Sequence, residues 1–140
     1  MNVPLIKGQN QKDNRGNLTF FNDFDMTPIR RFYITEPIDT DSIRAWQGHK
    51  KEQKWFFVLE GSFKVILVEP DDWDQPSKDL PYKEFALHAN TNEILNISAG
   101  TATGFQALEP YSKLMIFSDV TLEQSIADDY RFAKGLWYKW

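Results

Sequence analysis

The sequence contains few side chains able to exchange a proton near neutral pH. It has two histidines, His49 and His88, and no cysteine, so disulfides, thiolate metal sites and cysteine nucleophiles are excluded. Two imidazoles among scattered carboxylates are a poor ligand set for a transition metal. We therefore expect no metal and no other cofactor. His88 adjoins a turn, which favours a structural role for it.

His49 lies in a polar segment, residues 47–53, between two apolar stretches. Alternate residues of an extended chain share a face, so Gln47 and His49 are expected side by side, in the interior if that face points inward. A histidine, with an ordinary pKa of about 6.5, suits the removal of a proton at neutral pH. The alternative for a lone histidine is a surface or structural role, and this pattern does not decide between that role and catalysis.

Arginines accompany the aromatic strand-like segments of the first third of the chain. Arg30, Arg31 and Arg44 flank these segments, and Tyr33 alternates with Arg31 on one face of residues 29–35. A guanidinium fork binds phosphate oxygens and an aromatic ring can stack on a base, so this pattern favours a diphosphate ligand. The alternative is that each arginine merely solvates an edge strand.

Short runs of β-branched and aromatic residues, separated by Gly, Pro, Asn and Asp, predict the elements that position these side chains. Nine strands at this spacing indicate an all-β sandwich or barrel, and 140 residues indicate a single domain, residues 1–140. Turns are expected at residues 13–17 and 60–62. The predicted strands are 18–21, 29–35, 43–46, 55–59, 63–68, 83–87, 93–97, 104–108 and 113–118.

Two other segments have a distinct composition. Residues 69–81, EPDDWDQPSKDLP, are acidic and rich in proline, which predicts an exposed loop between strands. Thr121 with Gln124 three residues later predicts a capped short helix. The aromatic residues after it are too apolar for a solvated tail, so the C-terminal segment is expected to pack on the barrel or on a second subunit.

The overall charge limits the classes of partner. The chain has 16 basic and 20 acidic residues and a net charge of -4, so no broad basic face for nucleic acid is expected. Neither a signal peptide nor an apolar membrane-spanning stretch is visible. These features predict a cytoplasmic protein that binds neither nucleic acid nor membrane.

Several segments, in order, resemble a known enzyme family. They are Asp13-x-Arg15-Gly16-x-Leu18, Ile29-x-Arg31-x-Tyr33, Arg44 followed by His49-Lys50, and Gly61-Ser62-x-x-Val65. Over about residues 10 to 118 the chain resembles the cupin sugar-nucleotide isomerases. It is most similar to the WxcM-like dTDP-sugar 3,4-ketoisomerases and more distantly to dTDP-4-dehydrorhamnose 3,5-epimerase.

The resemblance implies an RmlC-like cupin jelly-roll β-barrel with a short C-terminal helical and aromatic segment, forming a homodimer. It implies a nucleotide-sugar substrate, a dTDP-4-keto-6-deoxyhexose, and metal-independent isomerisation in which a histidine or tyrosine removes the proton beside the ketone. The catalytic residues would be His49 and Tyr33. The substrate-binding residues would be Arg15, Arg31, Arg44, Gln47 and Lys50.

Two positions depart from the family pattern. Gln47 occupies the position of the family's catalytic histidine, and an amide cannot act as a general base. Thr103 stands where a histidine is common in the epimerases. Three functions therefore compete: an isomerase or epimerase that works with His49 and Tyr33, a non-catalytic cupin that binds a nucleotide sugar or carbohydrate, and a structural or assembly protein.

Overall fold

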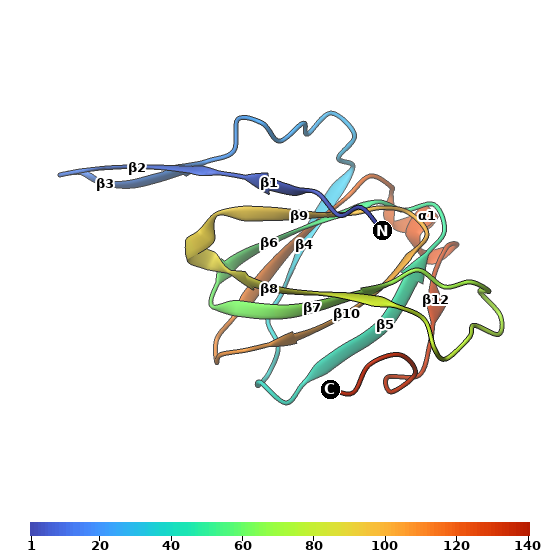
Figure 1. Ribbon diagram of the computed structural model, residues 1–140. Coiled ribbons are helices and arrows are strands. Elements are labelled where there is room, and N and C mark those ends of the chain that lie inside the picture. The colour runs from blue at the N-terminus through green and yellow to red at the C-terminus, as the bar shows by residue number, and fades with distance from the viewer.

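The computed structural model describes residues 1–140 and consists of two antiparallel sheets facing each other, with a separate hairpin (Figure 1). Each of the two facing sheets has five strands. The first contains, in spatial order, β1 (Leu5–Lys7), β9 (Glu93–Ile97), β6 (Lys54–Glu60), β11 (Lys113–Ser118) and β4 (Arg31–Thr35). The second contains β12 (Tyr130–Arg131), β5 (Ile43–His49), β10 (Thr101–Ala107), β7 (Ser62–Val68) and β8 (Tyr82–His88).

The remaining elements are short. Strands β2 (Gln9–Asp13) and β3 (Gly16–Phe20) form the hairpin, η1 (Ala89–Thr91) links β8 to β9, and α1 (Leu122–Ile126) follows β11. No helix is long and apolar enough to cross a membrane. The nine predicted strands are all present; 93–97 and 113–118 have the predicted bounds, and the other seven have shifted ends. Strands β1, β2 and β12 were not predicted, because they are short or polar and have no alternating apolar pattern.

The local signals in the sequence correspond to observed turns and caps. Gly61 has a φ of +74°, and a Cβ at this position would lie 2.1 Å from Ser112 Oγ, so the turn between β6 and β7 requires glycine. Thr121 and Gln124 form the expected capping box at the start of α1. Residues 69–81 form the expected loop between β7 and β8.

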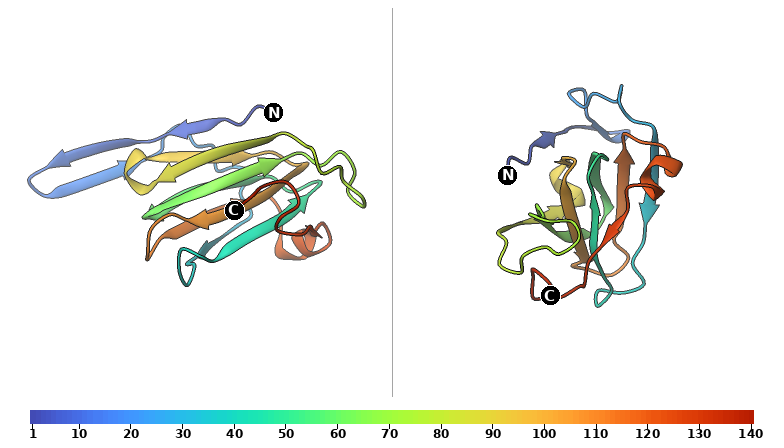
Figure 2. Two further views of the ribbon diagram at one scale, coloured as in Figure 1. Left: turned by 60° about the horizontal axis from the view of Figure 1, so that its bottom comes forward. Right: turned by 90° about the vertical axis from the view of Figure 1, so that its right-hand side faces the viewer.

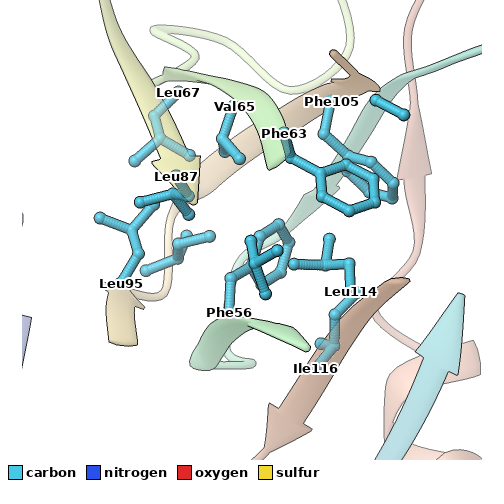
Figure 3. Packing of buried hydrophobic residues seen from close by; sticks show 12 residues of the cluster. Phe56, Phe63, Val65, Leu67, Leu87, Leu95, Phe105, Leu114 and Ile116 are labelled. Carbon is cyan, nitrogen blue, oxygen red and sulfur yellow. The ribbon is translucent and has the colours of Figure 1, made fainter. Parts of the chain in front are cut away.

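The main core lies between the two facing sheets (Figure 3). Alternation along the strands decides which side chains enter it: Phe63, Val65 and Leu67 of β7 point inward, whereas Ile66 and Val68 belong to a second cluster. The aromatic rings in the core meet edge to face. The cluster consists of Phe56, Val58, Phe63, Val65, Leu67, Leu87, Leu95, Ile97, Phe105, Ala107, Leu114 and Ile116.

The C-terminal segment packs on the barrel, over the second sheet. Trp137 is 6% exposed and meets Trp46 of β5 with ring centroids 5.3 Å apart. The Trp46 indole donates a hydrogen bond to Lys134 O, and the Trp137 indole donates one to Ser77 O. Figures 1 and 2 show this segment running beside β5 and β10. It therefore holds β12 in place next to β5.

The hairpin of β2 and β3 projects away from the two packed sheets (Figures 1 and 2). Its strands pair only with each other, and almost every residue in them is exposed. Leu18, an apolar residue, is 61% exposed. An isolated two-stranded hairpin is marginally stable in water, so this arm lacks a packing partner within its own chain.

Candidate active site in the barrel

A cavity of about 590 Å³ opens between β4, the edge strand of the first sheet, and the strand pair β5 and β12 of the second. Three of its lining side chains are basic, two of them arginines, and none is a carboxylate. An anionic ligand would therefore be attracted into this cavity. The lining residues are Tyr33, Thr35, Ile43, Arg44, Ala45, Trp46, Gln47, Lys54, Phe56, Thr103, Phe105, Ile116, Arg131 and Phe132.

Tyr33 reaches the cavity from β4 because alternate residues of this strand point inward. Arg31, Tyr33 and Thr35 are half-buried, whereas Phe32 and Ile34 between them are exposed. Burial and the negative charge of Glu52 raise the pKa of the Tyr33 phenol above its ordinary value of 10.0. The phenol is therefore protonated at neutral pH and can donate a hydrogen bond to a ligand oxygen.

The rim opposite Tyr33 comes from β5 and the C-terminal strand. Arg131 Nε and Gln47 Nε2 both donate to Asp129 Oδ1, at 2.8 and 3.2 Å. Burial acts to raise the pKa of Asp129, but these two hydrogen bonds and the charge of Arg131 keep it below its ordinary value. Asp129 thereby fixes an amide and a guanidinium at the cavity rim, near Arg44.

Lys54 lines the cavity from the start of β6 and is 4% exposed. Its nearest acceptors are Gln47 Oε1 at 3.5 Å and Glu52 Oε2 at 3.7 Å. Burial lowers the pKa of the amine below 10.5, although the charge of Glu52 opposes this change.

Behind this wall lies a buried cluster centred on the Glu52 carboxylate, whose side chain is fully buried. It accepts hydrogen bonds from Arg31 Nη2 at 2.8 Å, Ser118 Oγ at 2.6 Å and Ser125 Oγ at 3.2 Å. Burial acts to raise the pKa of Glu52, but the Ser118 hydrogen bond and the surrounding positive charges hold it below its usual value. Glu52 is therefore ionised at neutral pH.

His49 belongs to this cluster and is 3% exposed. Its Nδ1 donates to Asp128 O at 2.7 Å, because a carbonyl oxygen can only accept. Nε2 lies 3.0 Å from Glu52 Oε2 but forms no hydrogen bond. Burial lowers the pKa of the imidazole, and Lys54 adds to this effect. The negative charge of Glu52 opposes this lowering.

Asp128 holds the loop that connects β5 to β6. Its carboxylate accepts hydrogen bonds from the backbone N–H groups of Lys50, Lys51 and Glu52, at 2.9, 2.8 and 3.2 Å. The side chain is buried, so these bonds are shielded from water. Asp128, two residues beyond the end of α1, thus fixes the position of Glu52 through its carboxylate and of His49 through its backbone carbonyl.

The site residues suggested by the sequence fall into three groups. Tyr33, Arg44 and Gln47 line the cavity together. His49 and Arg31 lie behind it in the Glu52 cluster, so His49 does not face a ligand in the cavity. Lys50 and Arg15 lie outside the cavity.

Lys50 stacks on the rings of Trp73 and Tyr130, with Nζ 5.8 and 4.9 Å from their centroids. Arg15 lies at the turn of the projecting hairpin and forms an ion pair with Asp13, with Nη2 2.6 Å from Oδ2. Neither side chain lines the cavity of its own chain.

Three residues that line or border the cavity were missed from the sequence. Lys54 could have been found, since in the run KWFFVLE it alternates with Phe56 and Val58, which enter the core. Arg131 and Asp129 gave no such signal. They reach the cavity only because β12 pairs with β5, and this pairing joins residues about 80 positions apart.

The chain matches the WxcM-like, C-terminal family over residues 1–134 and belongs to this family. No curated protein matches the chain. A mutant of the 3,4-ketoisomerase QdtA from Thermoanaerobacterium thermosaccharolyticum, solved with TDP-4-keto-6-deoxyglucose, has a TM-score of 0.72 and 25% identity. That comparison covers 94% of this chain and 88% of QdtA.

Two further solved structures share the fold. The dTDP-4-dehydrorhamnose 3,5-epimerase from Bacillus anthracis has a TM-score of 0.76 and 17% identity, over 99% of this chain and 84% of the epimerase. The TDP-quinovose 3,4-ketoisomerase WlaRB from Campylobacter jejuni has a TM-score of 0.72 and 20% identity, over 94% and 93% of the two chains. The expected RmlC-like cupin fold is confirmed.

Proposed function

We propose that this protein is a sugar-nucleotide isomerase that acts on a dTDP-4-keto-6-deoxyhexose by removing a proton beside the ketone, as a 3,4-ketoisomerase or a 3,5-epimerase. The observation that carries this proposal is the cationic cavity with a protonated phenol in its wall. Membership of the WxcM-like family and the likeness to QdtA, which was solved with TDP-4-keto-6-deoxyglucose, support it.

The chemistry of such a reaction fits the residues of the cavity. Arg44 and Arg131 can bind the diphosphate, since guanidinium groups pair with phosphate oxygens. Proton removal next to a carbonyl produces negative charge on the carbonyl oxygen, which needs a hydrogen-bond donor. Tyr33 can supply that donor. Gln47 can hold a hydroxyl or carbonyl group of the sugar.

In this proposal His49 has an indirect role in the reaction. A base that removes a substrate proton directly must lie within hydrogen-bond distance of the substrate. The His49 imidazole does not line the cavity, and its Nδ1 is bonded to Asp128 O. We propose that His49 acts through Glu52, which lies between it and the cavity wall. His49→Asn should therefore reduce turnover more than it reduces ligand affinity.

The test is exchange of a carbon-bound proton of TDP-4-keto-6-deoxyglucose with solvent, followed by proton NMR in deuterated water. The wild-type protein should exchange one such proton. Tyr33→Phe should slow the exchange by about 100-fold or more, the cost of one oxyanion donor. Tyr111→Phe is the matched control, because Tyr111 is 89% exposed and lies outside the cavity. No exchange with any 4-keto nucleotide sugar, even at high protein concentration, would refute the proposal.

A non-catalytic nucleotide-sugar binding module is the second candidate function. The observation favouring it is that no histidine lines the cavity. Such a protein would be stabilised by TDP-sugars without any proton exchange. At 100 times the dissociation constant, a ligand adds about 2.7 kcal/mol to the free energy of unfolding.

We also propose that the protein is a homodimer in which the hairpin of β2 and β3 packs on the second copy. The hairpin has no packing partner in its own chain, and edge strand β4 exposes Phe32 and Ile34, which are 60% and 49% exposed. This arrangement would carry Arg15, at the turn of the hairpin, away from its own cavity and toward the partner.

Light scattering of the eluting peak in gel filtration tests the dimer. The wild-type protein should have twice the mass of the chain, and Leu18→Asp and Phe32→Asp should each shift it toward the monomer. Ile126→Asp is the control, because Ile126 is 69% exposed on α1, away from the hairpin. A monomeric wild-type protein would refute the proposal.

A further inference from the structure

Lys54 is a buried lysine whose amine reaches its two acceptors, on Gln47 and Glu52, only at long distances. An ammonium has three N–H donors and forms bonds of about 2.7 to 2.9 Å to carboxylates. The acceptors nearest to Nζ, on Gln47 and Glu52, are 3.5 and 3.7 Å away. The side chain is 5% exposed, so bulk water does not replace them. The amine is therefore held loosely at the cavity wall, and burial lowers its pKa below the ordinary value.

The charges around Lys54 act in the same direction. Glu52 would favour the ammonium, but its carboxylate already has Arg31 and two serine hydroxyls as partners. Arg31 and Arg131 both disfavour a further positive charge. The titratable and charged groups around the amine come from three strands and two loops. They are Arg31 and Tyr33 of β4, Arg44 and His49 of β5, Arg131 of β12, and Glu52 and Asp129 of the loops.

We propose that Lys54 is the base that removes the substrate proton, and that Glu52 and His49 hold its amine in position from behind. This inference rests on the proposed isomerase function. The C–H bond beside the ketone breaks and its proton becomes the third N–H of the Lys54 ammonium. The electron pair of that bond forms the C=C bond of an enolate, whose oxygen carries the negative charge. Return of the proton to carbon restores the amine.

Tyr33 and Lys54 form a complementary pair in this step. Burial pushes the phenol toward its neutral donor form and the amine toward its neutral acceptor form. Two titratable groups with pKa values pushed in opposite senses are suited to act as acid and base in one site. The phenol donates to the enolate oxygen while the amine holds the proton.

Glu52 and His49 are positioning residues in this arrangement. The Glu52 carboxylate lies between the imidazole and the amine, with Oε2 3.0 Å from His49 Nε2 and 3.7 Å from Lys54 Nζ. When Lys54 takes the substrate proton, this carboxylate stabilises the new ammonium. Nε2 of His49 faces this carboxylate and has no hydrogen-bond partner.

The first experiment measures the protonation of Lys54 directly in the wild-type protein. Side-chain NMR of ¹³Cε and ¹⁵Nζ follows each lysine through a pH titration, and the Lys54 signal is assigned by its absence in Lys54→Gln. Lys54 should titrate below 10.5, the ordinary value, and below the exposed lysines. A Lys54 midpoint equal to or above that of the exposed lysines would overturn the proposal without any appeal to activity.

The second experiment measures proton exchange from TDP-4-keto-6-deoxyglucose in the variants. Lys54→Gln should slow the exchange by about 100-fold or more, with KM changed several-fold at most, because a neutral amine adds little to phosphate binding. Lys64→Gln is the matched control, since Lys64 Nζ stacks on Tyr138 and Trp140 rather than lining the cavity. Circular dichroism and TDP binding confirm that the variants fold.

The third experiment tests the direction in which Glu52 changes the pKa of Lys54. Glu52→Gln removes a negative charge that favours the ammonium, so the Lys54 midpoint and the rising limb of the pH–rate profile should move to lower pH. A purely structural role for Glu52 would reduce the rate without this shift.

The outcomes separate the two proposals. If the wild-type protein exchanges the proton and Lys54→Gln exchanges it equally fast, Lys54 is not the base and the isomerase function stands. If the wild-type protein exchanges no proton, the isomerase function fails and the catalytic role of Lys54 fails with it.

Discussion

Replacing Asp128 with alanine should destabilise the protein far more than an ordinary loop substitution. The carboxylate accepts three backbone N–H bonds, from residues 50, 51 and 52, and is 7% exposed. Alanine leaves these donors without a protein acceptor. The N–H groups of Lys51 and Glu52 share one carboxylate oxygen, Oδ2, and that of Lys50 uses the other.

The expected cost follows from the number of lost bonds. Each contributes about 1 to 1.5 kcal/mol, so the free energy of unfolding should fall by about 3 to 4.5 kcal/mol. For a chain of this size that corresponds to a fall in Tm of about 10 °C. Asp128→Asn keeps one acceptor oxygen and should lose about half as much.

Urea denaturation followed by tryptophan fluorescence measures this loss, provided that the m-values agree. Asp119→Ala is the matched control, because Asp119 Oδ1 accepts only one such bond, from Gln53 N at 2.8 Å. That variant should lose about 1 kcal/mol. If Asp128→Ala cost no more than Asp119→Ala, the loop between β5 and β6 would not depend on the carboxylate, and the reasoning would be wrong.

Three further predictions concern packing and titration. Gly104→Ala should lower the free energy of unfolding, measured by urea denaturation, by about 1 to 3 kcal/mol, because the new Cβ would lie 2.7 Å from an aromatic ring of the C-terminal segment. Gly135 has open space around it, so Gly135→Ala should change the free energy of unfolding by no more than about 0.5 kcal/mol. Burial lowers the pKa of Lys54 in the folded protein, whereas in the unfolded chain the pKa is the ordinary 10.5. At a pH between the two pKa values, unfolding is therefore accompanied by the uptake of a proton at Lys54. The free energy of unfolding should rise by about 1.4 kcal/mol per pH unit between the folded-state and unfolded-state pKa values of Lys54. A Lys54→Met variant should lack this rise if Lys54 causes it. The hydrogen bond to Glu84 raises the pKa of Tyr138 to about 12, so ultraviolet titration of Glu84→Gln should show one tyrosine returning toward 10.0; an unchanged titration curve would contradict this assignment.

Much of the fold could be predicted from the sequence because local chemistry determines it. Alternating apolar residues fix which face of β7 enters the core, and Gly61 is required by a turn with positive φ. The capping box at Thr121 is likewise formed within four residues. The inward face of β4, with Arg31 and Tyr33 together, followed from the same period of two.

The composition of the site depended on tertiary structure. His49 and Gln47 are two residues apart, yet the imidazole lies in the Glu52 cluster and the amide lines the cavity, because Asp128, 79 residues away, fixes the position of His49. The sequence alone determined that Arg31 and Tyr33 share the inward face of β4 and that the end of β5 is polar. Only the pairing of β12 with β5 decided that Arg131 and Asp129 join them, because contacts between distant segments leave no periodic pattern in the chain.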